Sequence, residues 1–136
     1  MNGVTVTTII FLVLAVIEGV NGVQIAFRTK RTLESAGLSY DDGPGLVAQE
    51  FGVYNLGIAA AYLVAAFDPA RFWGVTIVGI AINLVAGAMH LLRSAGIYFG
   101  DARPVTSRGF ERKAGFVHVF ALLALFTTLP NFGLLN

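Results

Sequence analysis

Four long runs of apolar residues dominate the sequence, at 4–27, 46–67, 70–93 and 110–129. At about 1.5 Å per residue, a helix over each run is long enough to cross the roughly 30 Å hydrocarbon layer of a membrane. The chain has 136 residues, of which 56% are hydrophobic and 12% charged, more apolar surface than a soluble domain of this length can bury. We therefore predict one all-α domain over residues 1–136, an integral membrane four-helix bundle.

The basic residues indicate how such a bundle is oriented. Arg71 lies near the short connection between the second and third runs. The other basic residues lie in or beside the two longer loops, and they are Arg28, Lys30, Arg31, Arg93, Arg103, Arg108, Arg112 and Lys113. Because Lys and Arg favour the cytoplasmic side, we expect both loops there and both termini on the non-cytoplasmic side, in a multi-pass protein of a bacterial inner membrane. The chain has no cysteine, which excludes disulfides and thiolate chemistry.

The connections carry their own local signals. The first loop mixes charged residues with Leu33, Leu38 and Tyr40, as in a short amphipathic segment on a membrane surface. The stretch 41–45, DDGPG, is typical of a turn before the second helix. Asp68 is expected to cap the third helix, with the following proline at the first helical position.

The third run carries a stripe of small and polar residues. Gly79, Asn83, Gly87, His90 and Ser94 fall on one face at helical spacing. Small residues allow close helix contact, and lipid cannot satisfy polar side chains, so this face is expected to point into the bundle. The other runs offer comparable stripes, including 50, 54, 57 and 61 in the second and 111, 115, 118 and 122 in the fourth.

Polar side chains inside the runs concentrate in the cytoplasmic half. The candidate intramembrane site consists of Glu18, Asn21, Glu50, Tyr54, Asn55, Asn83, His90 and His118. Ionisable side chains at this depth are costly unless they are protonated, paired or hydrated. We therefore expect a polar cavity open to the cytoplasmic leaflet and closed toward the outside.

Three uses of this cavity remain open. Glu18, Glu50, His90 and His118 could bind zinc, iron or manganese, although no helix has the Glu-x-x-His spacing of di-iron bundles. A histidine and a carboxylate at similar depth could instead move a proton or act on a lipophilic substrate. Alternatively, the polar groups satisfy one another and fix the helix register.

A faint internal repeat is also visible. Residues 17–29 align without gaps on 82–94, which pairs Gly22 with Gly87. Residues 52–57 align on 115–120 at nearly the same offset. We interpret the two halves as parallel repeats about an axis along the membrane normal.

The four-span plan with short termini resembles the DoxX-like group of small bacterial membrane proteins, some of which accompany redox enzymes. The second run, with Gln49, Tyr54 and Asn55, is similar to the second helix of an uncharacterised four-helix family, although its Gln lies farther from the Tyr-Asn pair. Glu18 in the first run also resembles the first-helix carboxylate of small multidrug antiporters, but the longer loops and the added polar groups depart from that pattern. The resemblances imply no defined reaction.

Two functions follow as hypotheses. The first is an accessory or interaction subunit of a redox or respiratory membrane complex, with membrane lipids and either other membrane subunits or further copies of the chain as partners. The second is a stand-alone membrane enzyme or binding protein that uses the Glu/His cluster on a lipophilic small molecule, a quinone or a divalent metal. A proton-coupled small transporter ranks below both. The sequence requires no cofactor and indicates no nucleic-acid partner.

Overall fold

The structure is a computed structural model that describes residues 3–38, 40, 42–98 and 106–134. These residues form α1 (Gly3–Phe27), α2 (Thr29–Ser35), α3 (Asp42–Phe67), α4 (Gly74–Ser94), α5 (Arg108–Phe126) and the short 3₁₀ helix η1 (Leu129–Phe132), with no strand among them. Four of the helical segments are long and apolar enough to cross a membrane. The prediction of an all-α chain with four long apolar helices is therefore confirmed.

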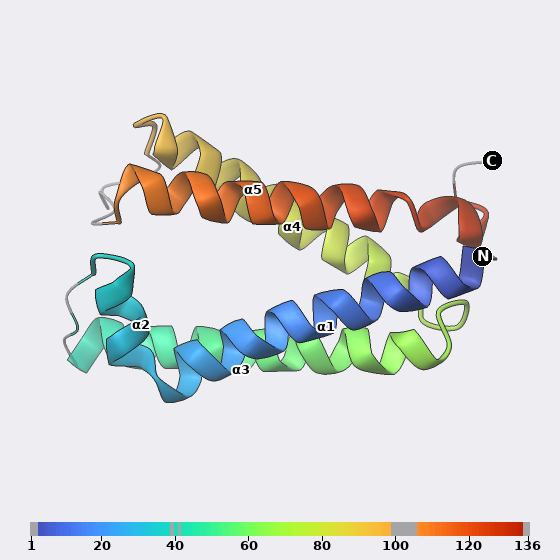
Figure 1. The fold of residues 1–136 in the computed structure, drawn as a ribbon, viewed down its shortest axis with the longest axis horizontal. Coiled ribbons are helices and arrows are strands. Elements are labelled where there is room, and N and C mark those ends of the chain that lie inside the picture. Colours follow the sequence, from blue (N-terminus) through green and yellow to red (C-terminus); the bar gives the residue numbers. More distant parts are fainter. Residues whose placement is uncertain (1–2, 39, 41, 99–105, 135–136) are drawn as a thin grey trace.

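The four long helices form two hairpins. Helix α1 packs along α3, and α4 packs along α5, as Figure 1 shows. The hairpins contact each other mainly at the end where α1 begins and η1 lies, and they diverge toward α2. The expected packing of the four helices into one bundle is therefore not confirmed.

The contact between the hairpins is a small apolar core. Phe11 of α1, Tyr62 of α3 and Leu125 of α5 are almost completely buried in it. The rings of Phe11 and Tyr62 lie 5.8 Å apart. Asn131 Nδ2 also donates a hydrogen bond of 2.9 Å to Thr7 Oγ1, which ties the segment after α5 to the first turns of α1. Apolar packing and this hydrogen bond therefore hold the hairpins together at this end.

Glycines that the predicted repeat aligns lie at close contacts between helices. In the first hairpin, a Cβ on Gly22 would lie 2.8 Å from Leu56 Cγ, and one on Gly52 would lie 2.8 Å from Ala26 Cα. In the second, a Cβ on the aligned Gly87 would lie 3.1 Å from His118 Cβ. Both hairpins thus use glycine to bring helix axes together, as small residues do in membrane helix pairs.

A second feature common to both halves was not predicted. The tetrapeptides SAGL (35–38) and SAGI (94–97) end α2 and α4. Gly37 and Gly96 adopt left-handed backbone conformations, with φ of 80° and 85°. The N–H groups of Leu38 and Ile97 each donate a 2.9 Å hydrogen bond to the carbonyl five residues earlier. Both are Schellman caps, in which glycine takes the left-handed position at little steric cost.

Several element boundaries differ from the expected ones. Helix α4 begins at Gly74 instead of 70, because Asp68 Oδ1 accepts a hydrogen bond from the Arg71 backbone N–H in a turn that precedes the helix. Trp73, not Asp68, is the N-cap residue. Helix α3 begins at Asp42, so most of the stretch 41–45, which was expected to be a turn, belongs to the helix. Asp41 and Arg103 lie outside the described residues.

The first loop, where we expected a short amphipathic segment, contains a short helix. Helix α2 follows α1 after a break at Arg28. Thr29 Oγ1 donates to the Ile25 carbonyl at 2.6 Å, and Thr32 Oγ1 donates to the Gln24 carbonyl at 2.9 Å. These bonds add side-chain donors to carbonyl groups in the last turn of α1, where helical partners run out. The corner between the two helices is therefore held by two threonine side chains of α2 that bond to the backbone of α1.

Candidate functional site

The polar side chains that the structure brings together lie between α4 and α5. Asn83 and Gly87 of α4 are buried, as is Gly115 of α5. A Cβ on Gly115 would lie 2.8 Å from Leu91 Cδ2, which shows how closely the two helices pass. The predicted stripes of these two helices therefore face each other.

At the end of this contact nearest the loops, His90 is paired with Glu111. His90 Nδ1 lies 2.6 Å from Glu111 Oε2. The hydroxyl of Thr106 donates a hydrogen bond to the other carboxylate oxygen. Glu111 is 2% exposed, although it lies in the first turn of α5. Arg93 also interacts electrostatically with this carboxylate.

Deeper along the same contact, His118 is paired with Asn83. Asn83 Nδ2 donates to the Gly79 carbonyl at 2.8 Å, so its oxygen is the atom that faces His118. His118 Nδ1 lies 2.9 Å from that oxygen and must therefore donate a proton to it. The hydrogen-bond partners thus fix the tautomer of a neutral His118, with the lone pair on Nε2.

The two imidazoles are neighbours. Their ring centroids lie 5.4 Å apart, and the ring planes differ by only 10°. Thr106, Glu111, His90, His118 and Asn83 therefore form one continuous line of polar groups, the histidine line, which runs from the loop end of α4 and α5 into the hairpin. Hydrogen bonds join Thr106, Glu111 and His90, and a separate one joins His118 to Asn83, while ring stacking connects the two sets. Within each set the hydrogen-bonded groups stabilise one another.

This geometry assigns separate tasks to the two nitrogens of each ring. Both Nδ1 atoms are held by oxygen acceptors of the protein. Such an arrangement orients each ring, as an outer carboxylate does for a metal-binding histidine. Each Nε2 is then able to accept a proton, to hydrogen-bond a carbonyl compound when protonated, or to ligate a metal.

The remaining predicted residues belong to the first hairpin and do not join the histidine line. Glu18 is half-buried and interacts electrostatically with Tyr62, and Asn55 is half-buried on α3. Asn21, Glu50 and Tyr54 are exposed. The stripe expected to point inward from α3 thus lies on its outer face, because the opposite face packs against α1.

The described residues contain no group of three or more His, Asp or Glu side chains that could hold a metal ion. The set expected from sequence, Glu18, Glu50, His90 and His118, is divided between the two hairpins. The structure thus gives no support to a metal centre built from these four residues.

Two members of the histidine line were not in the predicted site. Glu111 was placed on the stripe of the fourth helix, seven residues before His118, but was not assigned to the site. That spacing of two helical turns was the signal that could have identified it. Thr106 precedes the helix, where no periodic pattern applies, so no comparable signal existed.

Comparison with protein-family models, with curated proteins and with solved structures gives no match. The resemblance to DoxX-like proteins therefore stays a prediction. The fold defines the chain as a helical protein with four segments that are long and apolar enough to span a membrane.

Proposed function

We propose that this protein is an accessory subunit of a membrane complex of the redox or respiratory type, and that it contacts its partner through the outer face of α3. The observation that supports the proposal is the exposure of Glu50 and Tyr54 within the candidate span Gly45–Phe67. Hydrocarbon cannot satisfy such groups, and near the end of a span they are covered by protein or reach interfacial water.

The same face offers a surface for a partner helix. Gly57 and Ala61 continue the line of Glu50 and Tyr54 along α3, and both are exposed. A Cβ on Gly57 would meet no atom within 4 Å. A line of small residues lets two helix backbones approach closely, and the polar groups beside it supply hydrogen bonds across the contact. A protein partner fits this combination better than lipid does.

The test is native mass spectrometry of the protein extracted gently from its own membrane, with Gly57→Leu as the variant. We expect the wild-type protein to carry other subunits in fixed stoichiometry. Gly57→Leu should lower the assembled fraction about tenfold, because the larger side chain separates the helix backbones. Ala88→Leu on the exposed face of α4 is the matched control and should leave assembly intact. A wild-type protein that is a lone monomer, or equal losses in both variants, would contradict the proposal.

The histidine line supports a second candidate, a protein that binds a lipophilic carbonyl compound such as a quinone. The observation in its favour is the pair of stacked imidazoles whose Nδ1 atoms are held by Glu111 and Asn83, which leaves both Nε2 atoms for a ligand or a proton. Quinone reduction takes up protons, and a histidine pair next to a carboxylate is suited to supply them.

This candidate predicts that the two hairpins behave differently in a binding experiment. His118→Gln should weaken the binding of a short-chain quinone at least about tenfold, because the ring nitrogen that faces the ligand is lost. Glu18→Gln should leave binding unchanged, because Glu18 is not part of the histidine line. Binding to the purified protein in detergent can be measured by calorimetry. Loss of binding in Glu18→Gln with retention in His118→Gln would place the site in the first hairpin and contradict this assignment.

A further inference from the structure

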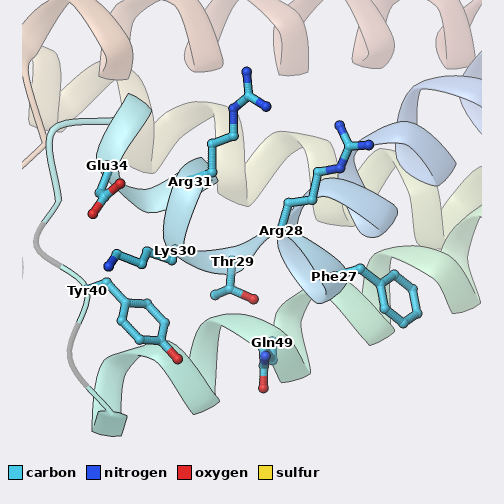
Figure 2. A pocket seen from close by; sticks show the side chains of 8 residues that line it. All are labelled: Phe27, Arg28, Thr29, Lys30, Arg31, Glu34, Tyr40 and Gln49. Carbon is cyan, nitrogen blue, oxygen red and sulfur yellow. The ribbon is translucent and has the colours of Figure 1, made fainter.

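The corner between α1 and α2 contains an open pocket of about 630 Å³. Figure 2 shows the side chains that line it, which are Phe27, Arg28, Thr29, Lys30, Arg31, Glu34, Tyr40 and Gln49. They come from the end of α1, from α2 and the segment after it, and from the beginning of α3. The pocket is distinct from the histidine line and from the outer face of α3.

The pocket is rich in positive charge. Its lining has three cationic side chains, Arg28, Lys30 and Arg31, and one carboxylate, Glu34. All three cations are exposed, and none forms an ion pair with another described residue. Figure 2 shows the guanidinium groups of Arg28 and Arg31 pointing to the same side of the corner, with Tyr40 and Gln49 on the opposite side. Two guanidinium groups on one side match the oxygen atoms of a phosphate group, which arginine binds through paired hydrogen bonds.

The corner that carries these cations is fixed by hydrogen bonds. Thr29 and Thr32 donate to the carbonyls of Ile25 and Gln24, across the break between the helices. The Tyr40 ring lies against the first turns of α3, where a Cβ on Gly45 would approach it. The backbone positions of the cations are therefore set before any ligand arrives, which lowers the entropic cost of binding.

The position of the pocket along α1 indicates that the phosphate group belongs to a lipid. The candidate span Val4–Phe27 ends at a residue that lines the pocket, and Phe27 is 75% exposed. Arg28 follows directly, so the cations lie at the depth where a membrane span leaves the hydrocarbon and meets the headgroups. An apolar ring next to cations fits a ligand with both an acyl chain and a phosphate.

We infer that this pocket binds the phosphate headgroup of an anionic phospholipid, with Arg28 and Arg31 as its main ligands. Basic residues at a membrane surface attract anionic lipids in proportion to their number. The pocket adds a fixed geometry to that attraction and so distinguishes one bound lipid from a diffuse layer. This inference is independent of the proposed partner contact on α3.

The test is native mass spectrometry of the purified protein with added phosphatidylglycerol, phosphatidylcholine or inorganic phosphate. The double variant Arg28→Gln/Arg31→Gln should weaken phosphatidylglycerol binding at least about tenfold. The matched control is Arg112→Gln/Lys113→Gln, which removes the same charge from exposed positions of α5 outside the pocket. The control should change binding less than about twofold, because only diffuse attraction is lost.

The outcomes separate the alternatives. The inference is supported if the wild-type protein binds phosphatidylglycerol in preference to phosphatidylcholine and only the pocket variant loses this preference. Equal losses in the two double variants would show diffuse charge attraction and overturn it. Binding of inorganic phosphate without a preference for phosphatidylglycerol would make free phosphate the ligand and overturn the lipid assignment. A thermal unfolding curve of each variant, matched to the wild type, ensures that folded protein is compared.

Discussion

Glu111→Ala is expected to lower the free energy of unfolding by about 3 kcal/mol, the low end of the range for breaking a buried pair. The low end applies because His90 is 23% exposed and keeps some access to water. The substitution removes the acceptor for both the His90 Nδ1–H group and the Thr106 hydroxyl. It also leaves the positive charge of Arg93 without its neighbouring carboxylate.

Two further variants separate the loss of the buried hydrogen-bond acceptor from the loss of a negative charge. Glu111→Gln keeps one side-chain acceptor and loses the charge, so its effect should be smaller than that of Glu111→Ala. Glu34→Ala removes an exposed carboxylate from α2 and should change stability by less than about 0.5 kcal/mol. Thermal unfolding in a mild detergent, followed by circular dichroism, measures all three. If Glu111→Ala and Glu34→Ala shifted the midpoint equally, the network around Glu111 would have no stabilising role.

Hydropathy was sufficient to predict the four long helices, because a membrane span leaves a continuous apolar run in the sequence. The helix ends were predicted less well where a side chain competes for backbone groups. Asp68 has the residue type of an N-cap, yet it accepts from the Arg71 N–H in the turn before α4. Short-range patterns do not distinguish these two uses of an aspartate.

The candidate site, like the helix ends, was predicted only in part. The α4 and α5 stripes were predicted because Asn83, Gly87 and Gly115 combine small size with polarity on one face, and that face lies in the hairpin contact. Depth along a span, however, does not specify which helices pair. Glu18 and His118 were expected at the same depth, but they belong to different hairpins. Only the tertiary arrangement separates them.

The orientation of α3 was the largest error, and its reason is specific. Gly52 and Gly57 are five residues apart, so their positions differ by about 140° around the helix at 3.6 residues per turn. Both fit a small-residue stripe, but a single helix can use only one of them against α1. The structure uses Gly52, and Glu50 and Tyr54 therefore accompany Gly57 on the outer face. A sequence pattern alone cannot decide between two such faces.

The same pair of glycines gives a matched test of this packing. Gly52→Ala should destabilise the protein by about 2 kcal/mol, because the added methyl group would meet the backbone of Ala26 and force α1 and α3 apart. Gly57→Ala adds the same methyl group to open space and should be neutral or stabilising by up to about 1 kcal/mol, the difference in helix propensity between the two residues.

Thermal unfolding of both variants in the same detergent decides whether the structure has paired the correct face of α3 with α1. The helix, the substitution and the loss of glycine flexibility are common to both, so a difference in midpoint reports the tertiary contact alone. A lower midpoint for Gly52→Ala only would support the face that places Glu50 and Tyr54 outside. The reverse order would mean that α3 is rotated, that the two polar side chains face α1, and that the outer face is not available to a partner.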